Sequence, residues 1–490
     1  MVKTVDVREG ITLDEYQAVA HLSEAVRDLR DKARALVPQL RGRTIWMINS
    51  TASGGGVAEM LPRLVTILRE LGVAVEWVVI GSDDPRFFAL TKRLHNLIHD
   101  SGNGQDLTSD DKALYDKVSQ DNADDLRRKV KPGDLLIVHD PQPLGVGSML
   151  RRELDVRAVF RSHIGLDDDT SRTRTAWEFL RPYATCYDHA IFSTQEYVPD
   201  FLAGRAGVIR PAIDPLSHKN RELRITQLVG ILCNSRLAVE QHPIVPAEFK
   251  QIVTRLAPNG QFLPANHSGG IGIPFRPIVT QISRWDKLKG FKPLLDGFVR
   301  LKERAQHGNV SDGLHQRRLQ LVRLVLAGPD PAAVADDPEA VDVLDELTKT
   351  YVALPRSFQE DIALVSLPMG VRKDNELIVN ALQRCSTVVV QNSLREGFGL
   401  TVTEAMWKHA VVLGSRACGI RQQIRDGVDG LLINDPENSD DIATKLDELL
   451  GDVDRRIRFG QSAQRRAHDE FLVFTQVQNW LTTLVQCCGG

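Results

Sequence analysis

Long apolar runs, paired cysteines and an excess of charge of one sign are all missing from this 490-residue sequence. No apolar stretch approaches the roughly 20 residues that span a bilayer, and the first ten residues are not followed by the apolar core of a signal peptide. The formal net charge of −3 gives no reason to expect nucleic acid or an acidic membrane as a partner. These absences favour a cytoplasmic protein.

The sequence also lacks the features of a metal centre. Its six cysteines form no C-x-x-C pair, so zinc is not expected, and a chain of this length does not depend on disulfides. An acidic cluster at Asp167, Asp168 and Asp169 has no second cluster at a spacing that would complete a cation site. A solvated loop is the simpler interpretation, and no protein-bound metal is predicted.

Two common nucleotide-binding motifs are absent as well. Residues 50–56 read S-T-A-S-G-G-G between a buried strand and a helix, which is not the G-x-G-x-x-G of dinucleotide-binding folds, and no lysine follows as in a P-loop. The turn therefore argues against a dehydrogenase and an ATPase. Its glycines would still let backbone N–H groups approach a phosphate or a sugar, and a plain tight turn explains them equally well.

Apolar, strand-like segments alternate with helical patterns through both halves of the chain. The length predicts two or three domains, and the alternation predicts an α/β fold with two Rossmann-like, doubly wound parallel sheets facing a central cleft. Ligands of such folds lie at the carboxyl ends of the strands. Strands are expected at residues 44–49, 73–80, 134–138, 156–161, 190–193, 278–282, 321–327, 361–367, 387–391, 410–414 and 430–433.

Five segments describe the expected organisation. A helical lead-in at residues 1–43 precedes a first Rossmann-like domain at 44–215. A linker or insertion with several prolines follows at 216–275. A second Rossmann-like domain occupies 276–465, and a helix with a tail occupies 466–490.

The segment at residues 395–404 reads R-E-G-F-G-L-T-V-T-E and follows the expected strand at 387–391. Strand, glycine turn and helix in this order expose backbone N–H groups at the helix N-terminus to an anion. Glu396 and Glu404 flank the turn, and each carboxylate could grip hydroxyl groups. The segment predicts a site for a sugar attached to a diphosphate, with candidate residues Glu396, Gly397, Gly399, Leu400, Thr401 and Glu404.

Two cations stand in S-R-W-D-K-L-K-G, directly after the expected strand at 278–282. The guanidinium of Arg284 and the ammonium of Lys289 suit a diphosphate leaving group. Alone they would be interpreted as solvated cations. Their expected position opposite the segment at 395–404 favours binding of the diphosphate instead.

Polar side chains also follow successive strands of the first half. His139 and Asp140 open H-D-P-Q-P, and His163 lies in R-S-H-I-G, so all three are candidates to line the cleft. Residues 91–96, T-K-R-L-H-N, are polar at helical spacing and could reach a sugar acceptor. An exposed helix face explains this last pattern equally well.

Together these segments resemble the retaining GT-B glycosyltransferases that carry an E-x7-E element. Within that family the likeness is closest to the group of trehalose synthase (glycosyl-transferring) and retaining trehalose phosphorylase. The segments that carry it keep the family's order between about residues 45 and 435: I-N-S-T-A-S-G-G-G-V-A-E-M-L, T-K-R-L-H-N, H-D-P-Q-P, R-S-H-I-G, I-F-S-T-Q-E-Y, P-A-I-D-P-L-S-H-K-N, Q-I-S-R-W-D-K-L-K-G and R-E-G-F-G-L-T-V-T-E-A-M-W-K.

The resemblance implies reversible transfer of glucose from a nucleoside diphosphate to the anomeric hydroxyl of free glucose, giving α,α-trehalose. It implies that Glu396 contacts the donor glucose, Glu404 the ribose, and His163 the donor sugar near the reacting carbon. Arg284 and Lys289 would hold the diphosphate in the second domain. No cofactor is implied, and Mg²⁺ would come only with the nucleotide. The remaining implied contacts are Gly54, Gly55 and Gly56 beside the phosphate and sugar, and Asn49, Lys92, His95, Asn96, His139 and Asp140 on the acceptor side.

Several alternatives stay open. A phosphorylase would use the same site to convert trehalose and phosphate into α-glucose 1-phosphate and glucose, and a non-catalytic protein would bind the sugar nucleotide without turnover. The sequence does not specify the base, the acceptor or the oligomeric state, for which a homodimer is a common prior. The chain also departs from the family's usual G-G-I, because Cys418 places a side chain there.

Overall fold

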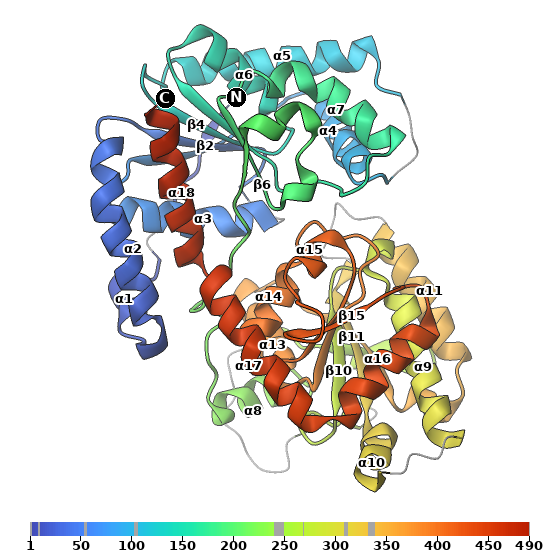
Figure 1. Cartoon of the computed structure of the whole chain (residues 1–490). Helices are drawn as coiled ribbons and strands as arrows, with labels where there is room; N and C mark the ends of the chain where they lie inside the picture. The colour runs from blue at the N-terminus through green and yellow to red at the C-terminus, as the bar shows by residue number, and fades with distance from the viewer. Residues whose placement is uncertain are drawn as a thin grey trace. The chain divides into compact units, whose positions relative to one another are not determined.

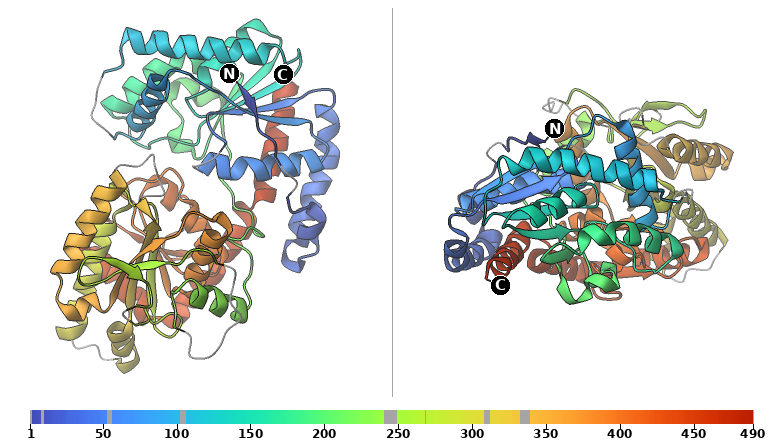
Figure 2. Two further views of the ribbon diagram at one scale, coloured as in Figure 1. Left: turned by 180° about the vertical axis from the view of Figure 1, so that it is seen from behind. Right: turned by 90° about the horizontal axis from the view of Figure 1, so that it is seen from above.

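The computed structural model describes residues 2–7, 10–52, 56–101, 106–239, 249–267, 269–307, 312–331 and 339–489. The chain forms two compact units, each built on its own sheet (Figure 1). Unit 1 combines Met1–Asp214 with Phe471–Gly490, and unit 2 is the continuous segment Pro215–Glu470. Unit 1 is therefore assembled from two separate segments, and Figure 2 shows both chain ends in it.

The sheet of unit 1 has seven strands in the order β1-β3-β2-β4-β5-β6-β7. All neighbours are parallel except β1 and β3. The central strands β2 and β4 are buried at every residue, as expected where helices cover both faces of a parallel sheet. The strands are β1 Lys3–Thr4, β2 Ile45–Asn49, β3 Val75–Val79, β4 Leu135–His139, β5 Arg157–Arg161, β6 His189–Phe192 and β7 Ala206–Val208.

The last helix, α18 (Val473–Cys488), packs beside α2 and α3 of unit 1 (Figure 1). The ring of its Phe474 packs edge-on against the ring of Tyr16, with 5.0 Å between the ring centroids. Its Trp480 is buried. The chain after Glu470 is thus part of the core of unit 1. The other helices of unit 1 are α1 Leu13–Gln17, α2 Ser23–Leu36, α3 Gly56–Glu70, α4 Pro85–Ile98, α5 Ser109–Arg127, α6 Leu144–Glu153 and α7 Ser171–Ala184, with short 3-10 helices η1 Ala20–Leu22, η2 Val37–Leu40, η3 Gln195–Tyr197 and η4 Asp200–Arg205.

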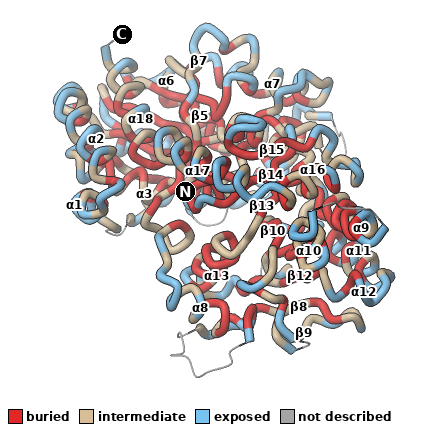
Figure 3. The backbone as a smooth tube through the Cα atoms, turned by 60° about the horizontal axis from the view of Figure 1, so that its bottom comes forward, coloured by how far each residue is buried: buried red, intermediate tan, exposed pale blue. Residues whose placement is uncertain are grey.

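The sheet of unit 2 has eight strands in the order β15-β14-β13-β10-β11-β12-β8-β9. Its first six strands in this order are parallel, and the hairpin β8–β9 adds two antiparallel strands to one edge. Buried residues concentrate along the central strands (Figure 3). The strands are β8 Thr254–Leu256, β9 Phe262–Pro264, β10 Ile278–Ile282, β11 Arg323–Pro329, β12 Ile362–Leu367, β13 Val388–Gln391, β14 Val412–Ser415 and β15 Gly430–Ile433.

Apolar clusters cover both faces of this sheet. One cluster packs Trp285, Phe291 and Phe298 against the strands, and the other contains Leu232, Ile282 and Ile378. The helices of unit 2 in the described residues are α8 Ile225–Asn234, α9 Phe291–His307, α10 Gly313–Leu321, α11 Glu339–Ala353, α12 Arg356–Gln359, α13 Arg372–Cys385, α14 Leu400–Trp407, α15 Cys418–Arg421, α16 Ser439–Gly451 and α17 Val453–Glu470, together with the 3-10 helix η5 Lys287–Lys289.

Every strand that the sequence pattern predicts is present, and no end differs by more than two residues. The pattern gives no sign of β1, β7, β8 and β9, because strands of two or three residues show no periodicity. Residues 216–275, expected to be a linker or insertion, contribute α8 and the hairpin β8–β9 to unit 2. In the described part of the chain, no helix combines the length and apolar character needed to cross a membrane.

Replacing Trp480 with alanine tests the contribution of α18 to unit 1. Deleting a buried indole should lower the free energy of unfolding of unit 1 by about 3–5 kcal/mol. Urea unfolding followed by circular dichroism measures it. The control is Asn479→Ala on the exposed face of the same helix, expected to stay within about 0.5 kcal/mol of the wild type. Equal losses in the two variants would contradict the packing described here.

Candidate functional site

The loops after β10 and β13 are held against each other. These strands are parallel neighbours, so their carboxyl ends open onto the same edge of the sheet. The buried amide of Gln281 donates to the carbonyl of Lys289 (2.7 Å) and accepts from the N–H of Asn392 (2.9 Å). The N–H of Leu394 also donates to the carbonyl of Leu288 at 2.7 Å. The two loops are therefore fixed as one structure.

Gly290 makes this close approach possible. Its φ of 61° lies in the left-handed region, and a Cβ at this position would collide with the carbonyl oxygen of Asn392. The amide of Asn392 donates to the carbonyls of Gly290 (3.1 Å) and Pro436 (2.8 Å). A glycine is thus required where the first loop turns into α9.

Lys289 and Glu396 form an ion pair where the two loops meet. The distance from Lys289 Nζ to Glu396 Oε2 is 2.7 Å. The same oxygen accepts from Ser393 Oγ (3.1 Å) and Gln391 Nε2 (3.4 Å). The two charged side chains are only 15% and 13% exposed, so solvent screens the pair weakly. The carboxylate is therefore held in one orientation beside a fixed ammonium.

The N-terminus of α14 follows directly after Glu396. Gly399 precedes the helix with φ 83° and supplies no side-chain cap to the first turn, which begins with Leu400 and Thr401. A Cβ on Gly399 would lie 2.9 Å from Cγ of Glu396. Helix N–H groups, an ammonium and a carboxylate are thus brought together near the start of α14, which suits an anion joined to a polyol.

The residue pair Cys418 and Gly419 lies beside this turn. The N–H of Gly419 donates to the carbonyl of Glu396 at 3.1 Å, and a Cβ on Gly419 would collide with the backbone of Phe398. The side chain of Cys418 is buried. Only the second position of C-G-I needs a glycine, which explains why this chain tolerates a cysteine at the first.

Glu404, on α14, is buried and pairs with a residue from the start of unit 2. Lys219 Nζ lies 3.6 Å from Glu404 Oε1. One turn later, Lys408 Nζ donates to the Glu404 carbonyl, to Asn220 Oδ1 and to Gln383 Oε1 at 3.0, 3.0 and 2.7 Å. Burial lowers the pKa of Lys408 to about 7, against the pull of Glu404. Both lysines were missed by sequence reasoning, although Lys219 lies in P-L-S-H-K-N.

Arg284 occupies the same loop as Lys289, on its exposed side. Its guanidinium lies 3.8 Å from Asp286 Oδ2, and its side chain is 59% exposed. Asp286 in turn accepts from the N–H of Leu288 and caps η5. The structure therefore places Lys289 in direct contact with Glu396. Arg284 lies apart from them, at the solvent-exposed side of the loop.

In unit 1, the two histidines predicted to line the site meet at the ends of β4 and β5. His139 Nδ1 and His163 Nε2 are 3.0 Å apart, with rings stacked at 5.3 Å between centroids. The N–H of His163 donates to Asp140 Oδ1 at 2.7 Å, and Asp140 adopts a left-handed φ of 65°. Within the described residues, the buried Nδ1 of His163 has no hydrogen-bond partner.

Burial controls the charge of this cluster. It lowers the pKa of His139 to about 3 and that of His163 well below its ordinary value, and the positive charge of buried Arg161 lowers both further. Burial also raises the pKa of Asp140 to about 6, opposed by the His163 N–H and by Arg161. Both imidazoles are therefore neutral near pH 7, and the Nδ1 of His163 can still form a hydrogen bond with a group such as a hydroxyl.

The other unit 1 candidates lie in different environments. Asn49 is buried, and its amide donates to the Thr51 carbonyl (2.6 Å) and accepts from Trp77 Nε1 (2.8 Å), so its orientation is fixed. Lys92, His95 and Asn96 share one face of α4, where Lys92 is exposed and the other two are half-buried. Gly56 begins α3. Gly54 and Gly55 lie outside the described residues.

The acidic cluster at 167–169 borders a cavity that the sequence did not indicate. Its volume is about 380 Å³, and Trp177, Tyr197 and Phe201 supply aromatic walls. The lining comes from the segments that follow β5 and β6, on the same edge as His163. In the described ranges, no three His, Cys, Asp or Glu side chains are grouped as a metal site. Carboxylates beside aromatic rings suit a polyol.

Comparisons with known proteins divide the chain in the same way. The family model "Trehalose synthase, N-terminal domain" matches residues 47–199 in unit 1. The model "Glycosyl transferases group 1" matches residues 367–466 in unit 2, which include Glu396 and Glu404. The first model includes His139 and His163, whereas the second begins after Arg284 and Lys289 and does not include them.

Similar proteins are found along the whole chain. Trehalose synthase of Pyrococcus horikoshii is 32% identical over 96% of this chain and 95% of its own length. Trehalose phosphorylase of Pleurotus pulmonarius is 24% identical over 99% of this chain but only 61% of its own length. An α,α-trehalose-phosphate synthase (UDP-forming) of Burkholderia vietnamiensis superposes with a TM-score of 0.63 at 16% identity, covering 91% and 98% of the two chains. The last likeness confirms the predicted GT-B fold.

Replacing His139 with glutamine tests the neutral state of the histidine pair. Between pH 6.5 and about 3, His139 is protonated in the unfolded chain but neutral in the folded protein. The free energy of unfolding therefore falls as the pH falls. In His139→Gln the free energy of unfolding between pH 6.5 and 4 should depend less on pH, by up to about 1.4 kcal/mol per pH unit.

Urea unfolding at several pH values measures this slope, and the contribution of Asp140 is common to both proteins. The matched control is Gln39→Ala, because Gln39 is exposed in the same unit and has no titratable side chain, so the slope should stay unchanged. A variant slope identical to that of the wild type would rule out a buried neutral His139.

Proposed function

The chain belongs to the trehalose synthase family of GT-B glycosyltransferases, and on this basis we propose a specific reaction for it. The protein transfers glucose, with retention, from a nucleoside diphosphate to the anomeric hydroxyl of free glucose and forms α,α-trehalose. The observation that carries the proposal is the Lys289–Glu396 ion pair at the N-terminus of α14. This arrangement suits the sugar and the diphosphate of one donor molecule.

The donor would contact unit 2 with three of its parts: the glucose, the diphosphate and the ribose. Glu396 would accept hydrogen bonds from hydroxyls of the glucose, and its fixed orientation makes these contacts specific. Lys289 and the first N–H groups of α14 would face the diphosphate, where negative charge grows as the glycosidic bond breaks. Glu404, held by Lys219, would accept the ribose hydroxyls.

The reaction then needs no basic residue from the protein. As the bond from C1 to the phosphate oxygen breaks, the sugar becomes oxocarbenium-like and the departing phosphate becomes a base. It takes the proton of the acceptor hydroxyl, whose oxygen forms the new bond to C1 on the same face, so the configuration is retained. Neutral His163 would donate to or accept from a sugar hydroxyl through Nδ1. Mg²⁺ would accompany the nucleotide rather than the protein.

Similarity favours a synthase over a phosphorylase. The synthase of Pyrococcus horikoshii matches over nearly its whole length, whereas the phosphorylase of Pleurotus pulmonarius is less identical and extends well beyond the matched part. A phosphorylase would place inorganic phosphate where the donor diphosphate lies, beside Lys289. The residues are compatible with both reactions, so the choice of co-substrate has to be measured.

Replacing Lys289 with methionine tests the donor site. Removal of one well-placed cation from the developing phosphate charge should lower kcat about 100- to 1,000-fold. The assay is trehalose formation from glucose with ADP-, UDP- and GDP-glucose in turn. The control is Lys287→Met, because Lys287 is an exposed lysine on the same loop and should keep wild-type activity. Near-native turnover by Lys289→Met would refute the assignment.

The reverse reaction separates the synthase from its alternatives. Trehalose incubated with a nucleoside diphosphate should yield the sugar nucleotide and glucose, and trehalose incubated with phosphate should yield neither glucose nor α-glucose 1-phosphate. Chromatography of the products distinguishes the two. Release of α-glucose 1-phosphate would identify a phosphorylase instead, and donor binding without any turnover would identify a sugar-nucleotide-binding protein.

A further inference from the structure

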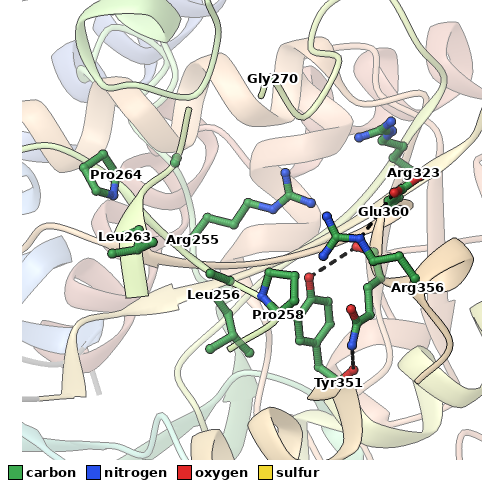
Figure 4. Close-up of a pocket in the computed structure, with 13 residues that line it drawn as sticks. Arg255, Leu256, Pro258, Leu263, Pro264, Gly270, Arg323, Tyr351, Arg356 and Glu360 are labelled. Atoms are coloured by element: carbon green, nitrogen blue, oxygen red, sulfur yellow. Dashed lines mark hydrogen bonds and ion pairs between the residues drawn. The ribbon is translucent and has the colours of Figure 1, made fainter. Parts of the chain in front are cut away.

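Unit 2 contains a second cationic pocket at the edge of its sheet. Figure 4 shows the side chains of Arg255, Arg323 and Arg356 converging on a cavity of about 200 Å³. They come from three different elements: β8, the start of β11 and α12. Convergence of guanidinium groups from separate elements is a common means of binding phosphate, because each presents several donors in a plane.

The three guanidinium groups are only partly satisfied by protein groups. Arg255 donates to the carbonyl of Ile362 at 3.1 Å, and Arg356 pairs with Glu360 at 3.3 Å on the exposed rim. Arg323 Nε lies 3.6 Å from Asp361 Oδ1. This buried Nε makes no hydrogen bond to any part of the protein that the structure describes.

Carboxylates do not balance the positive charge around the pocket. Asp361 is already bound by Lys302 at 2.8 Å, so Lys302 and Arg323 share one carboxylate. Burial lowers the pKa of Arg255 and of Arg323, and the nearby charge of Arg276 lowers the pKa of Arg323 further. The folded protein therefore holds cations whose charge an added anion would stabilise.

We propose that this pocket binds a small molecule that carries a phosphate group. The guanidinium groups of Arg255, Arg323 and Arg356 would bind the phosphate. The pocket also has walls of another kind, made by Pro258, Leu263 and Pro264 (Figure 4). These apolar surfaces would contact an organic part of the ligand.

The pocket is separate from the donor site. The pocket is lined by Arg323, the first residue of β11. Its Arg255 donates a hydrogen bond to the carbonyl of Ile362, the first residue of β12. Lys289 and Glu396 instead follow the last residues of β10 and β13. Because all four strands are parallel, the two sites lie toward opposite ends of the sheet. A phosphate bound here is therefore not that of the glucosyl donor.

Binding can be measured by calorimetry and thermal unfolding in a buffer without phosphate, with sulfate at equal ionic strength as reference. The probes are inorganic phosphate and ribose 5-phosphate, added to the Lys289→Met protein so that the donor site contributes little. Both should bind and raise the midpoint of unfolding. Tighter binding of ribose 5-phosphate would identify an organic phosphate as the ligand, and equal binding would identify phosphate itself.

In the same background, Arg323→Gln and Arg356→Gln should each weaken binding about tenfold or more, because each removes a charge-assisted contact. Arg356 is 62% exposed, so this variant keeps the test valid if Arg323→Gln folds poorly. The matched control is Arg317→Gln on α10, an exposed arginine outside the pocket, which should bind as before. No binding of either probe at 10 mM, or binding unchanged by Arg356→Gln, would overturn the proposal.

Discussion

The buried amide of Gln281 fixes the geometry on which the donor side of this protein depends. With its two ends it bonds the backbone of Lys289 and of Asn392, and so joins the loops after two neighbouring strands. It touches neither Lys289 Nζ nor the Glu396 carboxylate, yet it determines how far apart their backbones lie. A charge-stabilising site is effective when its groups are in place before the charge develops. Here the groups are held in place by Gln281, a neutral side chain inside the sheet.

The two units offer different chemistry at their strand ends. Unit 2 presents an ammonium, two carboxylates and a helix N-terminus, whereas unit 1 presents two imidazoles that burial keeps uncharged. This difference fits the parts of a sugar nucleotide reaction, since the phosphates are charged and the sugars are not. A cationic histidine in unit 1 would carry its charge in a buried place, which costs free energy.

Much of the fold and of the candidate site could be predicted from the order of short segments along the sequence. Strand, glycine turn and helix at 387–404 can be recognised without knowledge of distant residues, and parallel strands then bring 284–289 and His139 with His163 to the expected edges. Lys219 and Lys408 could not be found in this way. Lys408 donates a hydrogen bond to Asn220, which is 188 residues away in the sequence. The residues around each position do not indicate that the two side chains meet. The hydrogen bonds that hold Asn49 to Thr51 and Trp77 could not be read from the sequence either, and its predicted contact with the acceptor stays a prediction.

The division of unit 1 into two segments has a consequence for how the chain folds during synthesis. Residues up to Asp214 leave the ribosome first, but the helix that completes their core, α18, is made only after all of unit 2. Domains generally fold as units as they are synthesised. Unit 2, which is continuous, can therefore reach its final structure while unit 1 still waits, with the apolar faces of α2 and α3 uncovered. The segment of unit 1 that is made before unit 2 can thus complete its core only after unit 2 has been made.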